Sequence, residues 1–318
     1  MATDMQSDST ITRRTAIAAG AAVTVAMAQS ASAGKSDNDD TPWIDAHSHI
    51  WTPDVDRFPL QPGMTIENLS PRSFNAEELM EIARPEGVGR VVLIQHPPFH
   101  GFDNSYLIDA CRRYPDTFRM VGGVDDLRPN CGKAMKQLLK QRVTGFRIGP
   151  REGITDWLNT SGMTEMWKTA VETRQAMCCL IDAKHLPLLD AACRKYPETP
   201  VVIDHFARIG IDGEIRDNEV TDLCRLAAHP YVKVKVSAYY ALGKKQPPHA
   251  ELIPLIRRLC DTFGPNRLMW ASDCPYQLTR GNTYASSISL IRDRIDFVTE
   301  AERRQLLRTT AEETFFFA

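Results

Sequence analysis

Short apolar runs alternate with helical patterns along the chain from residue 42 onward. Apolar runs of this length, bounded by polar residues, favour buried strands. Between them, the helical face formed by Leu107, Ile108, Cys111 and Tyr114 ends at Pro115. Eight strands that alternate with helices predict parallel βα units and the α/β class. We predict these strands near residues 42–47, 90–96, 118–125, 144–149, 176–182, 200–205, 232–237 and 267–273.

The predicted architecture is one closed (β/α)8 barrel, or TIM barrel, over residues 42–318. No low-complexity tract or second linker interrupts this part of the sequence. An open doubly wound sheet is the alternative, but no glycine-rich phosphate loop follows the first predicted strand. In a barrel the chemistry lies at the carboxyl ends of the strands, so the polar residues there are the candidates for a site.

The first 33 residues differ in kind from the rest of the chain. Arg13-Arg14 precedes an alanine- and valine-rich run from Ala16 to Ala28, and Ala31-Ser32-Ala33 offers small residues for cleavage. This layout resembles a bacterial twin-arginine export signal, and the run is too short to span a bilayer comfortably. We predict a signal peptide over 1–33, a polar linker over 34–41 and export, to the periplasm.

Charge and composition narrow the class of partner. The chain has 38 basic and 40 acidic residues, a formal charge of -2 and no long block of like charge. Nothing therefore points to nucleic acid or to an anionic membrane surface once the signal is removed. A small-molecule substrate is the expected partner, and the oligomeric state is left open.

The eight cysteines are predicted to be free thiols. Cysteines in an exported protein usually indicate disulfides. Here all but Cys131 and Cys274 lie within predicted helices or strands, where a buried cysteine packs as a small hydrophobic residue. Proteins with such signals are also expected to fold before export, while their thiols are still reduced.

Ionisable residues follow the predicted strands at the end where chemistry is expected. His47 and His49 end the first strand, and side chains two residues apart in a strand point the same way. His205 follows the sixth strand and Asp273 the eighth. These four residues suit zinc or a similar divalent ion with one position left for water. Taken singly, a chance histidine pair, a core histidine and a helix-capping aspartate are the alternatives.

Three segments resemble the motifs of the amidohydrolase-related superfamily of metal-dependent hydrolases. They are Asp45-Ala46-His47-Ser48-His49, Val202 to Arg208 and Leu268 to Pro275, and the likeness covers nearly all of residues 42–318. The chain is similar to the branch that holds sugar-acid lactonases, sulfomuconolactone hydrolase and pyrone dicarboxylate lactonase. With the last it shares the patterns His100 to Asn104 and Gly145-Phe146-Arg147. The resemblance implies an enzyme that opens a lactone or related cyclic ester with water.

The resemblance also bears on the cofactor. Superfamily members with two metal ions usually bridge them with a lysine or glutamate on strand four, where this chain has Arg147. Strand five leads to Asp182 rather than to a histidine. We therefore expect one divalent ion, with zinc as the first candidate. Some lactonases of this branch are thought to work without metal, their histidines polarising the carbonyl directly, so a metal-free site stays open.

The same residues suggest catalytic roles. Asp273 is the predicted general base, because a carboxylate beside a metal or imidazole cluster can take a proton from water while staying mostly ionised. His47 and His49 would hold the ion or bind the carbonyl oxygen. His205 would stabilise the tetrahedral oxyanion or help to bind the ion.

Four further residues are candidates for substrate binding. Arg147 and Arg208 could clamp an anionic group through paired hydrogen bonds, although either could form a structural ion pair instead. His96 and His100 are plausible pocket residues, with solvated loop histidines as the alternative. His249 lies away from the predicted site and is expected at the surface.

Two departures from pyrone dicarboxylate lactonase affect the expected substrate. That enzyme has an arginine shortly after strand seven, where this chain has Ser237 to Tyr240, and a tyrosine on strand five, where it has Leu180-Ile181. A different lactone with a carboxylate or sulfonate is therefore expected. The alternatives are a decarboxylase of the same superfamily, whose usual glutamate before the first ligand is absent at Asp45-Ala46-His47, and a non-catalytic binding barrel.

Overall fold

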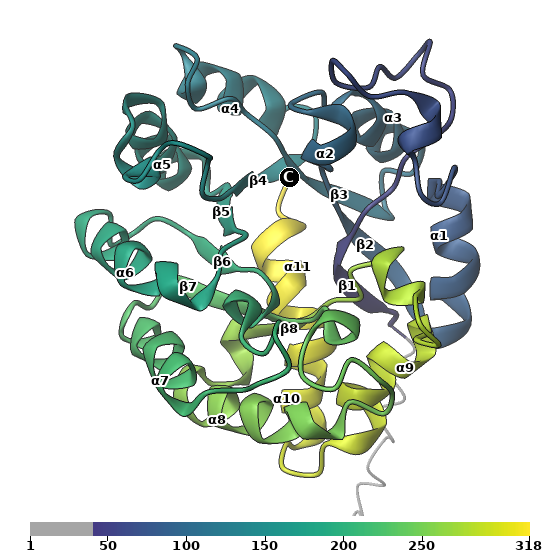
Figure 1. Ribbon diagram of the computed structural model, residues 1–318, viewed down its shortest axis with the longest axis vertical. Helices are drawn as coiled ribbons and strands as arrows, with labels where there is room; N and C mark the ends of the chain where they lie inside the picture. Colours follow the sequence, from purple (N-terminus) through teal and green to yellow (C-terminus); the bar gives the residue numbers. More distant parts are fainter. Residues whose placement is uncertain (1–40) are drawn as a thin grey trace, which may run out of the picture. The chain divides into compact units, whose positions relative to one another are not determined.

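The computed structural model describes residues 41–318, which form an eight-stranded barrel with helices around it (Figure 1). Every neighbouring pair of strands is parallel, and the strands follow one another in sequence order. The strands are β1 (Trp43–Ser48), β2 (Val88–Ile94), β3 (Phe118–Gly122), β4 (Val143–Ile148), β5 (Ala176–Cys179), β6 (Val201–Ile203), β7 (Val232–Val236) and β8 (Leu268–Trp270).

The barrel closes between β1 and the segment that follows β8. Ser48 and Cys274 form a parallel bridge. The amide of His49 donates to the carbonyl of Cys274 at 2.7 Å, and the amide of Asp273 donates to the carbonyl of His47 at 2.8 Å. The predicted site residues of the first and last strands therefore lie side by side across this seam.

Helices cover the outside of the barrel and its amino-terminal end. They are α1 (Ala76–Ala83), α2 (Pro97–His100), α3 (Ser105–Arg113), α4 (Cys131–Leu139), α5 (Ser161–Thr173), α6 (Leu186–Lys195), α7 (Asp217–Arg225), α8 (Ile253–Phe263), α9 (Tyr284–Ser289), α10 (Glu300–Arg304) and α11 (Thr310–Phe315). The N-terminus of α1 is fixed by a capping box, in which the Asn75 side chain accepts from the amide of Glu78 at 2.9 Å.

Two sets of buried apolar residues stabilise the barrel. The larger lies between the strands and the surrounding helices. The smaller fills the inside of the barrel and includes Val92, Val202 and Met269 together with Phe315 of α11. In Figure 1, α11 lies across the middle of the ring of strands. Because Lys233, near the start of β7, donates to Thr314 of α11, this helix covers the amino-terminal end and leaves the carboxyl end for a site.

The predicted barrel is confirmed, with differences in detail. β5 ends at Cys179, three residues before Asp182, because the chain turns there into the loop that leads to α6. Cys131, predicted outside any helix, is the first residue of α4. His249, expected at the surface, is wholly buried against the ring of Tyr239, so that prediction was wrong. The eight cysteines, all of them within residues 41–318, are free. No helix of residues 41–318 is long and apolar enough to cross a membrane.

Candidate active site

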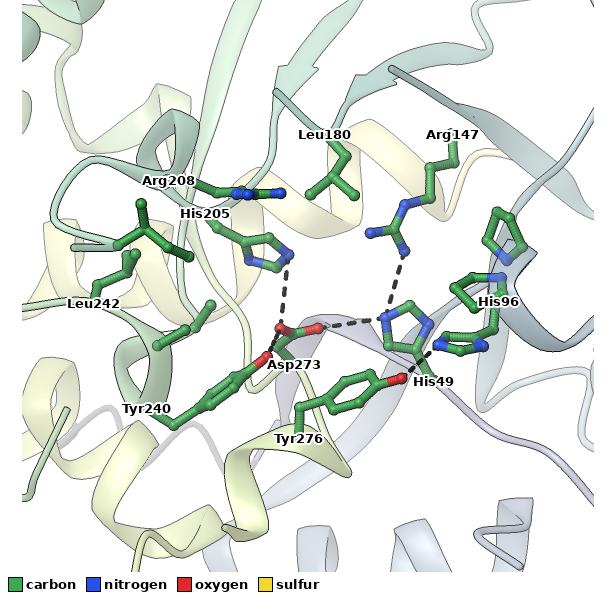
Figure 2. A pocket seen from close by; sticks show the side chains of 15 residues that line it. His49, His96, Arg147, Leu180, His205, Arg208, Tyr240, Leu242, Asp273 and Tyr276 are labelled. Carbon is green, nitrogen blue, oxygen red and sulfur yellow. Dashed lines mark hydrogen bonds and ion pairs between the residues drawn. The ribbon is translucent and has the colours of Figure 1, made fainter. Parts of the chain in front are cut away.

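A cavity of about 470 Å³ opens at the carboxyl end of the barrel (Figure 2). Its walls come from the loops after most of the strands. The predicted site residues that line it are His49, His96, Arg147, His205, Arg208 and Asp273. His47 lies beneath this wall and is wholly buried. The fold therefore brings most of the predicted site residues together around one pocket.

The two histidines of β1 turn toward the same point, as their spacing predicts. Their Nε2 atoms are 3.3 Å apart. Oδ1 of Asp273 lies 3.4 Å from the Nε2 of His47 and 3.4 Å from that of His49. The three atoms thus form a nearly equilateral triangle of possible ligands.

This triangle has the dimensions of a divalent metal site. A tetrahedral zinc ion with bonds of about 2.0–2.1 Å separates neighbouring ligand atoms by about 3.3–3.4 Å. His47, His49 and Asp273 meet this spacing and could hold an ion. His205 forms a second possible set of ligands with His47 and Asp204, and the ligand atoms of this set lie within 4.8 Å of one another. Both sets are buried, which favours binding of an ion without competition from bulk water.

Asp273 is held from several sides. The hydroxyl of Tyr240 donates to its Oδ2 at 2.8 Å, and Nε2 of His205 lies 3.8 Å from the same oxygen. Burial raises the pKa of Asp273 above its usual value, partly offset by His205 and Tyr240. A carboxylate with a raised pKa is a stronger base than an exposed aspartate, which suits proton removal from water.

His205 sits in an unusual stretch of backbone. His205, Phe206, Ala207 and Arg208 have φ values of 52°, 54°, 52° and 56°. A left-handed conformation costs a non-glycine residue roughly 1–2 kcal/mol, so the surrounding packing must enforce this turn. The turn places the His205 ring where its Nδ1 is 2.8 Å from the hydroxyl of Ser237 and its Nε2 faces Asp273. Burial lowers the pKa of His205, which keeps the ring neutral near pH 7.

Arg147 reaches into the pocket from β4 and approaches His49. Its Nη1 lies 3.4 Å from Nε2 of His49 (Figure 2). Nδ1 of His49 is 2.9 Å from the carbonyl oxygen of Ile94, which can only accept, so the proton of this neutral ring is on Nδ1. Burial, with Arg147 as the next cause, lowers the pKa of His49 to about 3.

The remaining candidates differ in their surroundings. Arg208 lines the pocket but its Nε pairs with Oδ1 of Asp182 at 2.9 Å. Nε2 of His96 is 2.5 Å from the hydroxyl of Tyr276, and burial lowers the pKa of His96 to about 2. Among the described residues, His100 is not part of the pocket wall, and its Nδ1 is 3.0 Å from the carbonyl of Pro59.

Sequence reasoning missed several residues of the site. Tyr240 and Tyr276 line the pocket and stack at 6.4 Å, but both lie in short 3-10 helices after the strands, where tyrosine carries no special signal. Lys235 is buried within β7 beside His47. The sequence alone could have singled out Lys235, because a lysine among the valines of a buried strand such as Val232–Val236 is rare.

Asp45 joins β1 to the segment after β8, beneath the site. Its Oδ1 accepts from the amides of Ser272 at 2.9 Å and His47 at 3.1 Å. Its Oδ2 accepts from the hydroxyls of Ser272 at 2.6 Å and Tyr284 at 2.9 Å. These four hydrogen bonds compensate the burial, which still raises the pKa of Asp45 to about 6. Asp45 thereby fixes His47 against the segment that carries Asp273.

Two curated proteins resemble the chain over most of its length. It is 29% identical to L-fucono-1,5-lactonase from Burkholderia ambifaria over 241 residues, which is 75% of this chain and 82% of that one. It is 26% identical to 4-sulfomuconolactone hydrolase from Rhizobium radiobacter over 238 residues, which is 73% of this chain and 75% of that one. Both relatives are lactone hydrolases by name.

A solved structure and a family comparison agree with the fold. An amidohydrolase from Burkholderia multivorans, solved with bound zinc, superposes with a TM-score of 0.72 at 18% identity, covering 87% of this chain and all of that one. Residues 44–317 match the amidohydrolase family. The match covers the barrel and the strand ends that carry the pocket. The chain is therefore a member of the amidohydrolase family, and a lactonase-like enzyme within it.

Proposed function

We propose that this enzyme hydrolyses a lactone or related cyclic ester that bears a carboxylate or sulfonate, with Asp273 as general base. One observation carries the proposal: Asp273, His205, His49 and Arg147 all line the same pocket. A base, two neutral imidazoles and a cation at one point are the groups that ester hydrolysis with an anionic substrate needs.

The proposed reaction follows from these positions. Asp273 takes a proton from water while the water oxygen forms a bond to the lactone carbonyl carbon. Negative charge develops on the carbonyl oxygen, where the neutral ring of His205 would stabilise it. The ring C–O bond then breaks, and the departing alkoxide takes up the proton held by Asp273. Lactone and water are thus converted to the hydroxy acid.

Tyr240 restricts Asp273 during this reaction. Its hydroxyl occupies Oδ2 of Asp273 at 2.8 Å, whereas Oδ1 lies within 3.4 Å of both strand-one histidines. We therefore assign Tyr240 the role of holding the carboxylate in one orientation. A fixed base loses less entropy when the transition state forms.

We further propose that one divalent ion, most simply zinc, binds at His47, His49, His205 and Asp273. The triangle of ligand atoms and the zinc in the Burkholderia multivorans structure support this proposal. Such an ion would polarise the carbonyl and lower the pKa of bound water. The metal-free alternative assigns the polarising role to the imidazoles. Metal content of the purified protein, and its activity after chelation, distinguish the two.

The walls of the pocket support a compact anionic lactone. Leu180, Ile211 and Leu242 are apolar, so they offer few hydrogen bonds to a polyhydroxylated sugar ring. Arg147 provides the cation for a carboxylate or sulfonate. One of the two relatives is named for a sulfonated lactone.

A panel of lactones tests the proposed function. We expect acid release, followed by titration at constant pH, from an anionic lactone, with loss of that activity in His205→Ala. The control is His229→Ala, a histidine on the outside of the barrel that pairs with Asp190. Release of carbon dioxide from aromatic acids instead would indicate a decarboxylase. Absence of both reactions would favour a non-catalytic binding barrel.

Export is a separate proposal. Residues 1–33, assigned to a twin-arginine signal, and most of the linker over 34–41 lie outside the described residues. The support is the sequence pattern alone. N-terminal sequencing of protein recovered from the periplasm should begin near Gly34, whereas a product that begins at Met1 would contradict the proposal.

A further inference from the structure

Lys235 is a buried charged residue with no part in the reaction proposed above. It lies in β7, its side chain is wholly buried, and it does not line the pocket of the site. Its Nζ is 3.0 Å from Oδ1 of Asp204 and 3.1 Å from Nδ1 of His47. A buried ammonium is costly, so these two partners must account for its presence.

The contact with Lys235 determines what Nδ1 of His47 can do. An ammonium group can only donate hydrogen bonds, and that of Lys235 pairs with the carboxylate of Asp204. A proton on Nδ1 of His47 would point at this donor at 3.1 Å, while the carboxylate of Asp204 is farther away, at 3.5 Å. Nδ1 of His47 therefore accepts from Lys235.

The other side of the His47 ring leads to the same assignment. Its Nε2 is 3.3 Å from Nε2 of His49 and 3.4 Å from Oδ1 of Asp273. His49 carries its proton on Nδ1, toward the carbonyl of Ile94, so its Nε2 is an acceptor. Since Nη1 of Arg147 already faces Nε2 of His49 at 3.4 Å, Oδ1 of Asp273 is the neighbour that calls for a proton on Nε2 of His47. A proton on this atom fits the contacts of the ring with Lys235 and with Asp273.

We propose that Lys235 is a positioning residue that fixes His47 as the Nε2–H tautomer, so that the ring donates toward Asp273. In this state only His49 offers a nitrogen lone pair at the triangle of ligand atoms. Binding of an ion there requires the proton of His47 to move to Nδ1, where Asp204 is the available acceptor. Lys235 therefore weakens metal affinity and helps to orient the general base when no ion is bound.

The tautomer of His47 can be read directly in the wild-type protein. Nitrogen-15 NMR of the full-length, metal-depleted protein separates protonated from lone-pair imidazole nitrogens, and His47→Gln assigns the signals. We expect a lone pair on Nδ1 and a proton on Nε2. A proton on Nδ1 would overturn the proposal. This measurement involves no substrate, so its outcome is independent of the proposed lactonase function.

A substitution tests the effect on metal binding. In Lys235→Met, Nδ1 of His47 is free to donate to Asp204, and we expect zinc affinity, measured by competitive dialysis, to rise at least about tenfold. The control is Lys233→Met, a lysine two residues away on β7 that donates to Thr314 instead. Unchanged affinity in a folded Lys235→Met protein would contradict the proposal. If this variant does not fold, the wild-type spectra decide.

Discussion

At the scale of single residues, the site depends on how a few side chains are held. Asp273 lies between Tyr240 on one oxygen and the strand-one histidines on the other. Arg147 is close enough to His49 to act on both that ring and a bound anion. Substitutions at Tyr240 and at Arg147 should therefore affect different steps, catalysis for Tyr240 and binding of an anionic substrate for Arg147.

Removal of the Tyr240 hydroxyl should slow the chemical step. Tyr240→Phe loses the hydrogen bond to Oδ2 of Asp273 but keeps the ring that stacks on Tyr276. We expect kcat to fall about tenfold, equivalent to about 1.4 kcal/mol, with little change in KM. The control is Tyr231→Phe, at a side chain that is 50% exposed. An unchanged kcat would show that Tyr240 does not orient the base.

Loss of the Arg147 cation should affect anionic substrates selectively. A hydrogen bond to a charged group contributes roughly 1.5–3 kcal/mol, so Arg147→Met should raise KM about 10- to 100-fold for an anionic lactone. A neutral lactone of the same ring size should be much less affected. The control is Arg128→Met, whose side chain is 81% exposed. Equal loss for both lactones would contradict the assigned role.

At the scale of elements, the ends of β1 and β8 carry the site and are joined by Asp45. The sequence predicted both strands and the pair of histidines, because a buried parallel strand is a nearly continuous apolar run and its polar residues stand out at the end. It could also indicate which residues share a barrel rim, since parallel strands end at the same edge. Eight strand ends meeting at one rim made this prediction possible.

The remaining parts of the site could not be predicted from local pattern. Tyr240 and Tyr276 lie in single-turn 3-10 helices of the connections after β7 and β8, whose course depends on packing rather than on periodicity. Lys235 contacts His47 only because the closed barrel brings β7 and β1 to the two sides of β8. His249 shows the opposite error, since a polar residue in a loop was expected at the surface but is buried against Tyr239.

Substitution of Asp45 should loosen the seam between the first and last strands. Asp45→Asn replaces one acceptor oxygen by a donor, so at least one of its four partners is left facing another donor. We expect the free energy of unfolding in urea to fall by about 2–3 kcal/mol. Asp296→Asn, at a side chain that is 90% exposed, should have little effect. Equal stability of the two variants would contradict this role.

At the scale of the whole molecule, four buried histidines gather at and beneath the pocket at the carboxyl end of the barrel. Burial lowers the pKa of each of His47, His49, His96 and His205 from the usual value of 6.5. The folded protein therefore binds fewer protons than the unfolded chain below that pH. Since the unfolded state gains protons as pH falls, the histidines make stability decrease toward acid.

This linkage predicts a loss of stability before the carboxylates titrate. Each such histidine contributes about 0.8 kcal/mol between about pH 7.5 and about pH 6, so unfolding in urea should require roughly 3 kcal/mol less at the lower pH. Below about pH 6, protonation of Asp45, whose pKa is raised to about 6, acts in the opposite direction. A urea midpoint that does not change between these two pH values would mean that the histidines are not buried as neutral rings.

The measurement that tests the account most directly is the effect of Asp273→Asn on hydrolysis of the best lactone of the panel. An amide cannot accept the proton of water, so we expect kcat/KM to fall about 10³-fold while circular dichroism shows the wild-type fold. The exposed Asp296→Asn variant should retain wild-type kcat/KM. If Asp273→Asn kept kcat/KM within about threefold of wild type, Asp273 would not be the general base.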